Sequence, residues 1–358
     1  MKIQKTRSVS LDLVRILAAF WVLGFHWITC PGCFYGFKSV PKMDWVSPIF
    51  HSVCEWGFLG VDIFFILSGS LIAKSAIDND WFNFTRERFA RLFPAYFLVG
   101  LLSLFLYPIA TNSAINVEKI FSLSGLQFWI GGPAIIAVGW TLPIEISFYL
   151  LITIALFFYN RRKKFGSKEL RDFLNIWLLM YILSIALNFQ PLQNLFIPSY
   201  APYFILGAAL SLVKSAEDFL ANIFTIFVSL VLTLKFVFHR VDAYPFLHHK
   251  FIMSVLLVAC MSGIIIYSNR RVVSSPTNLI RQSIRTLSLM TYPIYLIHLE
   301  VGLTFVYLYL QIGITSKLSF LASAITILVI SYLVVRFFEP FCKKIIFQYF
   351  VSNKLRKL

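Results

Sequence analysis

Arg15 and His26 are ionisable residues within one apolar stretch that begins near Leu11. They are eleven residues apart, close to three turns of an α-helix, so both side chains lie on one face, about 16 Å apart along the axis. Asp12, three residues before Arg15, falls on nearly the same stripe. Ionisable groups are costly inside a bilayer and usually face a polar, functional interior. The alternative is three unrelated side chains that snorkel to the interface.

A second carboxylate, Asp62, interrupts the apolar run Gly60–Ser70. Ser68 and Gly69 follow it, and small residues permit close backbone approach to a neighbouring helix or to a ligand. Helix packing and ligand binding explain Gly69 equally well. Helix packing does not explain Asp62.

Arg88 and Arg91 come after that run and are three residues apart, on one face of an expected short helix. Two guanidinium groups at this spacing suit a phosphate. Plain anchoring of a cytoplasmic loop would produce the same residues, so both explanations stay open.

Two further apolar segments contain ionisable groups. Glu145 follows Trp140 and lies beside Pro143, which we expect to bend its helix. A carboxylate next to a broken membrane helix favours a functional role. In the other segment His298 lies one turn after Tyr295 and two residues before Glu300.

The composition predicts an all-α, polytopic membrane protein. Hydrophobic residues make up 59% of the 358 residues, charged residues 13%, and the mean hydropathy is +0.78. The net charge of +16 is explained by the positive-inside rule, and we expect no nucleic-acid partner. No cleavable signal peptide is evident after Lys2, Lys5 and Arg7.

Hydropathy predicts a bundle of about ten spans, of which the fifth and sixth are short, at roughly 11–31, 56–73, 92–110, 135–159, 173–189, 201–214, 219–238, 251–268, 287–310 and 318–338. With both termini in the cytoplasm, 25 of the 32 Lys and Arg residues fall on the inner side and 7 on the outer side. This bias supports an even number of spans and that orientation. We therefore expect a membrane domain at 1–340 and a basic cytoplasmic tail at 341–358, without internal repeats.

The cysteines Cys30, Cys33 and Cys54 fall on or near the expected outer loop at 32–55. Cys30 and Cys33 are spaced for a disulfide, and free thiols are an equal alternative. The pattern lacks the further cysteine or histidine ligands of a zinc site, so no metal is expected.

Together these motifs resemble the acyltransferase-3 family of membrane-bound O-acyltransferases. The resemblance runs in order from about residue 8 to residue 338, and five motifs carry it: Arg15 with His26, Gly60–Gly69, Arg88–Arg91, Trp140–Glu145 and Tyr295–His298. Thr141 and Pro143 stand where family members often have Ser, and the Arg-Gly often found before Asp12 is absent. Some members carry an extra extracytoplasmic domain after the last span, which we do not expect for this protein.

The resemblance implies that an acyl group, usually acetyl, moves from cytoplasmic acyl-CoA to a hydroxyl of a surface polysaccharide or its lipid-linked precursor. It implies a place in the inner membrane of a bacterium, surrounded by lipid. Acetyl-CoA would be a co-substrate, and the acceptor sugar and the oligomeric state stay open.

For the chemistry, His26 is the expected base because neutral imidazole titrates near physiological pH. Arg15 lies nearer the inner edge, where the phosphates or pantetheine of CoA would arrive. Asp62 is expected to orient His26, and Glu145 to do the same or to bind sugar hydroxyls. Direct transfer and a covalent acyl intermediate both stay open.

Two other functions place ionisable residues in a membrane. A secondary transporter does so, although the sequence shows no repeat symmetry. A non-catalytic subunit of an envelope glycan export machine is the other alternative.

Overall fold

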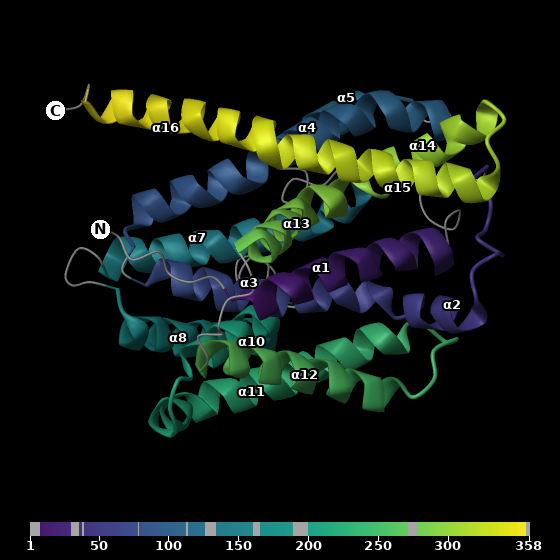
Figure 1. Cartoon of the computed structure of the whole chain (residues 1–358). Coiled ribbons are helices and arrows are strands. Elements are labelled where there is room, and N and C mark those ends of the chain that lie inside the picture. The colour runs from purple at the N-terminus through teal and green to yellow at the C-terminus, as the bar shows by residue number, and fades with distance from the viewer. Residues whose placement is uncertain are drawn as a thin grey trace. The chain divides into compact units, whose positions relative to one another are not determined.

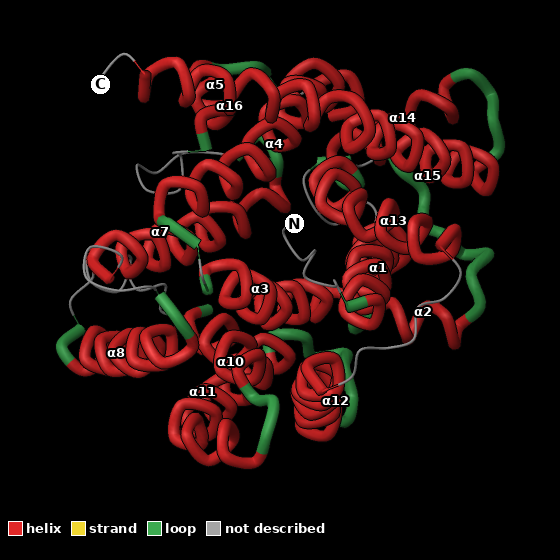
Figure 2. The backbone as a smooth tube through the Cα atoms, turned by 60° about the vertical axis from the view of Figure 1, so that its left-hand side comes forward, coloured by secondary structure: helices red, strands yellow, loops and turns green. Residues whose placement is uncertain are grey.

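The structure is a computed structural model, and it describes residues 8–29, 36–37, 39–77, 79–111, 114–125, 134–159, 165–188, 200–270 and 278–355. Most of the described residues are helical, and none of them lies in a strand (Figure 2). This confirms the predicted all-α fold class. Cys30 and Cys33 lie outside the described residues.

Within the described ranges, seven helices or continuous helical segments are long and apolar enough to cross a membrane, and an eighth span results if a bent pair counts as one. The protein is therefore a polytopic helical membrane protein, while the count of ten stays a prediction. The seven are Val9–Thr29, Pro48–Ala76, Trp81–Thr111, Ala137–Tyr159, Ala216–Asp242, Lys250–Asn269 and Ser316–Gln348.

The chain divides into two compact units whose boundaries fall within helices. Unit 1 consists of Met1–Arg15, Leu59–Thr85 and Ile144–Arg285. Unit 2 consists of Ile16–Phe58, Arg86–Pro143 and Thr286–Leu358. Asp12 and Arg15 belong to unit 1, and His26 belongs to unit 2.

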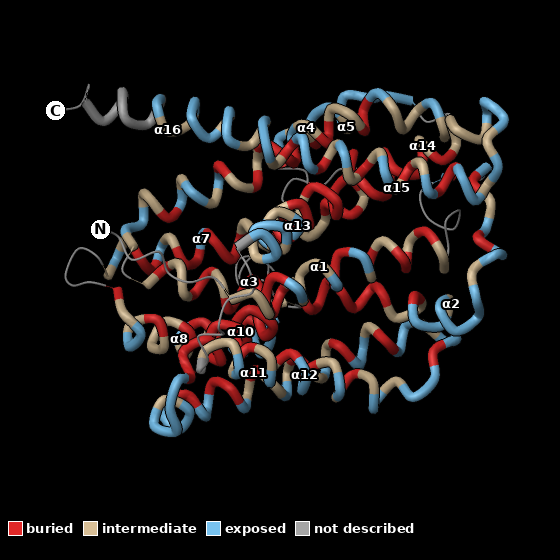
Figure 3. The backbone as a smooth tube through the Cα atoms, in the orientation of Figure 1, coloured by how far each residue is buried: buried red, intermediate tan, exposed pale blue. Residues whose placement is uncertain are grey.

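Unit 1 is built mainly from helices α3 (Gly60–Ala76), α7 (Thr141–Tyr159), α8 (Ser167–Ala186), α10 (Ala201–Leu212), α11 (Ala216–Asp242) and α12 (Lys250–Arg270) (Figure 1). At its centre α10 is buried along its whole length and packs against α3, α8, α11 and α12 (Figure 3). Its 12 residues extend about 18 Å, too short for a bilayer core of about 30 Å. The sixth predicted span is thus a short internal helix that protein surrounds.

Two glycines allow α3 and α10 to touch at the backbone. A Cβ at Gly69 would overlap the carbonyl of Phe204, and one at Gly207 would overlap the carbonyl of Ile66. Such reciprocal close approach is the usual use of small residues between membrane helices. It supports the packing explanation for Gly69, while donor binding by Gly69 stays a prediction.

Unit 2 contains the end of α1 (Val9–Gly24), most of α4 (Trp81–Thr111) and the helices after Arg285. Its other elements are η1 (Phe25–Thr29), α2 (Pro48–Cys54), η2 (Gly57–Leu59), α5 (Val117–Phe121), η3 (Ser122–Ser124), η4 (Ala137–Trp140), α13 (Asn278–Ile297), α14 (Glu300–Gln311), α15 (Ser316–Leu333), η5 (Val334–Phe338) and α16 (Glu339–Leu355). Helices α14 and α15 pack against each other, and α15 continues through η5 into α16 (Figure 1).

The structure corrects two sequence predictions. Pro143 does not bend the middle of a helix, because it lies in the first turn of α7, where its missing N–H removes no intrahelical hydrogen bond. The span predicted at 287–310 is not continuous, because α13 and α14 meet at an angle of 72°. The break falls at His298 and Leu299, a few residues after Pro293.

Candidate functional site

His26 lies in a π-helical turn, η1, that follows α1 directly. Such turns are rare and are often found at functional sites. The turn changes the register of the helix, so the straight-helix stripe from Arg15 to His26 does not continue unchanged past Gly24. Trp27, in the same turn, satisfies one backbone group: its indole Nε1 donates to the His298 carbonyl at 2.8 Å.

His298 lies in the break between α13 and α14 and faces His26. The His298 Nε2 is 3.1 Å from the His26 Nδ1, and the ring centroids are 5.0 Å apart. His298 is buried, with 1% of its surface exposed. The two histidines are 272 residues apart in sequence, and the fold of unit 2 brings them together.

The backbone partners of these rings determine where their protons lie. The His298 Nδ1 is 2.7 Å from the Tyr295 carbonyl and 3.2 Å from the Ile294 carbonyl. A carbonyl only accepts, so Nδ1 of neutral His298 carries the proton and Nε2 carries the lone pair. The His26 Nδ1 therefore donates, to His298 Nε2 and to the Val22 carbonyl at 3.0 Å. Neutral His26 then carries its own lone pair on Nε2, the atom that can take up a proton.

Tyr295 and Glu300 connect the helix break to η4. The Tyr295 hydroxyl donates to the Val138 carbonyl at 3.0 Å, and the Ala137 N–H donates to Glu300 Oε1 at 2.5 Å. Glu300 is buried, and it begins α14, where a carboxylate is favoured by the helix dipole. Trp140, at the end of η4, is half-buried.

Unit 1 brings together Ser68 and Glu145, which the sequence placed in different motifs. The Ser68 hydroxyl donates to Glu145 Oε1 at 3.0 Å, and the Tyr149 hydroxyl donates to the same oxygen at 2.8 Å. Glu145 lies in the first two turns of α7, which Thr141 begins. Its carboxylate is therefore oriented by two hydroxyl groups.

Asp62 is fully buried in the first turn of α3, and its partner is Arg240. The Arg240 Nη1 donates to Asp62 Oδ2 at 2.6 Å. The sequence did not predict this pair, because the two residues are 178 positions apart. The role of Asp62 in orienting His26 stays a prediction.

The remaining site residues lie near helix ends. Asp12 is buried in the first turn of α1, and Arg15 lies one turn further on. Arg88 and Arg91 are half-buried on α4, which runs unbroken from Trp81 to Thr111, so they lie within a long helix and not on the short helix expected.

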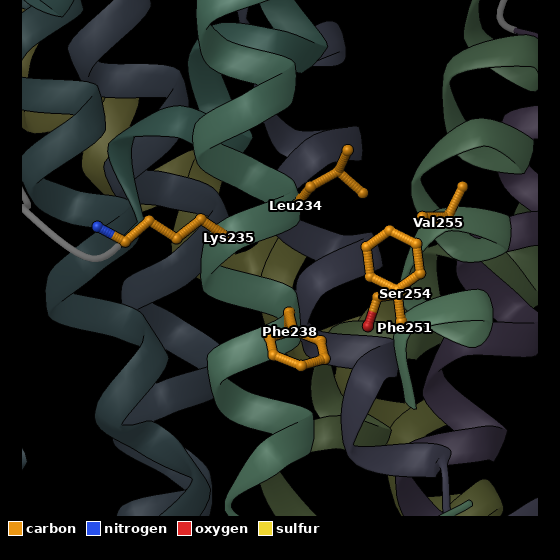
Figure 4. A pocket seen from close by; sticks show the side chains of 6 residues that line it. All are labelled: Leu234, Lys235, Phe238, Phe251, Ser254 and Val255. Atoms are coloured by element: carbon orange, nitrogen blue, oxygen red, sulfur yellow. The ribbon is translucent and has the colours of Figure 1, made fainter. Parts of the chain in front are cut away.

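No group of three or more His, Cys, Asp or Glu side chains arranged to hold a metal occurs in the part of the chain that the structure describes. A hollow of about 240 Å³ lies between α11 and α12, lined by Leu234, Lys235, Phe238, Phe251, Ser254 and Val255 (Figure 4). Lys235, its only ionisable lining residue, extends away from the other five side chains in Figure 4. None of the site residues predicted from the sequence lines this hollow.

Comparison with known proteins gives a family and several partial relatives. The family model described as an acyltransferase domain matches residues 8–336. An O-acetyl transferase of Shigella phage Sf6 is 29% identical over 44% of this chain and 49% of its own length. Acyltransferase MdmB of Streptomyces mycarofaciens is 34% identical over 26% of this chain and 27% of its own length.

The peptidoglycan O-acetyltransferase OatA of Listeria monocytogenes is 29% identical over 33% of this chain and 24% of its own length. The chain thus matches between about a quarter and a half of the length of these curated relatives. No solved structure matches. Because the family model covers nearly the whole sequence, in the order in which the motifs occur, the chain belongs to the acyltransferase-3 family.

Proposed function

We propose that this protein is an integral membrane O-acyltransferase that moves an acyl group, acetyl in the first instance, from acyl-CoA to a hydroxyl of a surface polysaccharide or lipid-linked glycan. Family membership supports the reaction class, and two relatives are named as O-acetyl transferases. The observation that carries the proposal is the contact between His26 and His298, 3.1 Å between ring nitrogens.

His26 is the general base of the proposed reaction. Its Nε2 takes the proton of the acceptor hydroxyl while the hydroxyl oxygen attacks the thioester carbonyl. The C–O bond forms, the C–S bond breaks, and the imidazolium returns the proton to the departing thiolate of CoA. Proton transfer by a positioned group typically contributes about 10²–10⁴-fold to the rate.

His298 positions His26 through its own lone pair. It holds the His26 Nδ1–H, and its ring is in turn fixed by two backbone carbonyls. A nucleophile or acid, a base and a third group that orients the base form the general pattern of such sites. Tyr295 supports the arrangement by fixing the turn at Val138.

For the other substrate contacts, we assign Arg15, with Asp12, to the phosphates or pantetheine of the donor, Ser68 to donor binding, and Glu145 to hydroxyls of the acceptor sugar. Arg88 and Arg91 bind the phosphates of the acyl-CoA donor, because two guanidinium groups three residues apart share a helix face. The 25-to-7 distribution of basic residues supports an inner-membrane location with both termini in the cytoplasm, which places these arginines on the donor side.

The donor assignment predicts a selective kinetic effect. Replacing Arg88 and Arg91 together with alanine should raise the KM for acetyl-CoA at least tenfold, since each charged hydrogen bond contributes about 1.5–3 kcal/mol. The KM for the acceptor should stay unchanged. Lys168 and Arg171, also three residues apart and in another predicted inner segment, provide the matched control. An unchanged KM for acetyl-CoA would show that Arg88 and Arg91 act only as topological anchors.

Radiolabelled acetyl-CoA incubated with membranes tests the function as a whole. An O-acyltransferase moves the label onto glycan, and mild base should release it as acetate, because the new bond is an ester. Label that accumulates in vesicles without modifying glycan would indicate a transporter. If the label neither modifies glycan nor accumulates in vesicles, the protein is a non-catalytic subunit.

A further inference from the structure

The C-terminal helix α16 meets the beginning of α4 within unit 2. The Arg86 guanidinium, from α4, lies over the Phe347 ring of α16, with its Cζ 3.9 Å from the ring centroid. Glu339, at the start of α16, lies within electrostatic reach of Arg91, which is again on α4. The two contacts follow opposite orders along the two helices, so the beginning of α4 runs antiparallel to α16 here.

One face of α16 is turned toward these arginines. Glu339, Lys343 and Phe347 recur at four-residue intervals, so their side chains share that face. The Lys343 Nζ is 5.3 Å from the centroid of the Phe347 ring and lies within electrostatic reach of Glu339. Lys344 lies about 100° further round the helix. None of the described contacts of Phe347 and Glu339 involves Lys344.

The surface shared by the two helices has an excess of positive charge. The two arginines and Lys343 supply three cations around one carboxylate, Glu339, while Arg88 and Glu87 add one charge of each sign. Among the described residues, no ion pair of 4 Å or shorter joins Glu339 to Arg91 or Lys343. The carboxylate thus leaves these cations accessible to another anion.

This surface is open to a dissolved ligand. Lys343 is exposed, and Arg86, Arg91 and Glu339 are half-buried. An exposed excess of positive charge attracts polyanions, and Lys and Arg are the side chains that bind phosphate groups. The end of CoA that carries its nucleotide has a pyrophosphate and a ribose phosphate, so it matches several cations distributed over two helices.

We propose that α16 is the second wall of the donor site and that Lys343 binds a phosphate of CoA together with Arg86 and Arg91. The identification of the anion as CoA rests on the proposed function. Glu339 weakens binding, because its carboxylate faces the incoming phosphates. Anionic lipid headgroups are the competing ligand, and they would use the exposed lysines of α16 whichever face those lysines occupy.

The test measures binding without acyl transfer. The full chain in nanodiscs of phosphatidylcholine, a lipid without net charge, is titrated with radiolabelled CoA. Dephospho-CoA, which lacks the ribose phosphate, and pantetheine, which lacks every phosphate, are the competitors. The variants are Lys343→Gln and Glu339→Gln. Lys344→Gln is the matched control, because it removes the same charge from the neighbouring exposed position.

We expect Lys343→Gln to bind CoA about fivefold more weakly, the effect of one charge contact near water. Lys344→Gln should bind CoA as the unmodified protein does, and Glu339→Gln should bind it at least twofold more tightly. Pantetheine should compete equally well in all four proteins, which shows that the variants are folded. Dephospho-CoA should compete less well than CoA in the unmodified protein.

Three results would overturn the proposal: no binding of CoA, equal losses in the two lysine variants, or weaker binding in Glu339→Gln. Equal losses would indicate a general attraction of anions to α16, as lipid headgroups require. The outcome is separable from that of the reaction. Binding of CoA that depends on Lys343, in a protein that transfers no acetyl group, would refute the reaction and leave the site standing. Acetyl transfer with CoA binding independent of Lys343 would do the reverse.

Discussion

At the scale of single residues, His298 determines which nitrogen of His26 carries the proton. His298 presents its lone pair to His26 because two backbone carbonyls take its only proton. The sequence predicted both histidines as functional residues, from their place among apolar neighbours. It did not predict their contact, because local periodicity contains no information about which distant helices pack together.

The contact predicts a non-additive pair of variants. His298→Ala should lower kcat at least tenfold with little change in either KM, because it misorients the base without touching the substrates. Adding His298→Ala to His26→Ala should lower kcat no further, since the two residues act as a unit. Steady-state kinetics of the two single variants and the double variant measure this. Independent losses that multiply in the double variant would show that the histidines act separately.

At the scale of elements, the site depends on places where helices are irregular. His26 occupies a π-helical turn, and His298 occupies the 72° break between α13 and α14. Hydropathy located both apolar segments but treated each as a straight helix. Predicting the break would have required knowledge of a tertiary contact. The His298 carbonyl at the break accepts a hydrogen bond from the Trp27 indole, which lies 271 residues away in the sequence.

The close crossing of α3 and α10 predicts that a single added methyl group destabilises the protein. Gly69→Ala or Gly207→Ala should lower the free energy of unfolding by about 1–3 kcal/mol, because the added Cβ overlaps backbone that cannot move away. Gly263→Ala on α12 is the control: its Cβ would meet nothing within 4 Å, and alanine should stabilise that helix by about 0.5–1 kcal/mol. Unfolding in detergent measures all three. Equal behaviour of Gly69→Ala and Gly263→Ala would contradict the close crossing.

At the scale of the whole molecule, composition was sufficient for the fold class. An apolar content of 59% predicted a helical membrane protein, and the helices confirm it. The number of spans was harder to predict. Helix α8 is not among the described helices that are long and apolar enough to cross a membrane, and α10 is short and internal. Apolar residues fill buried protein as readily as they cover lipid-facing surface, so hydropathy alone does not distinguish the two.

The proposed orientation predicts the labelling of single cysteines in a cysteine-free background. With the outer membrane permeabilised, a cysteine at Ser39 should react with a membrane-impermeant maleimide in intact cells. A cysteine at Ser167 should react only after lysis. The charge distribution is the physical reason, because basic residues in short loops are retained in the cytoplasm. The reverse pattern would place Arg88 and Arg91 on the acceptor side and remove their donor role.

The central claim is that His26 is the base of an acyl transfer. Transfer of label from acetyl-CoA to glycan, compared between the unmodified protein, His26→Ala and His239→Ala, tests it most directly. His239 is an exposed histidine near the end of α11 and serves as the control. At equal amounts of membrane protein, His26→Ala should lose about 10²–10⁴-fold of the transfer rate, and His239→Ala should lose none. A His26→Ala protein that retains more than about a tenth of the transfer rate would contradict the claim, since loss of a general base costs at least a hundredfold.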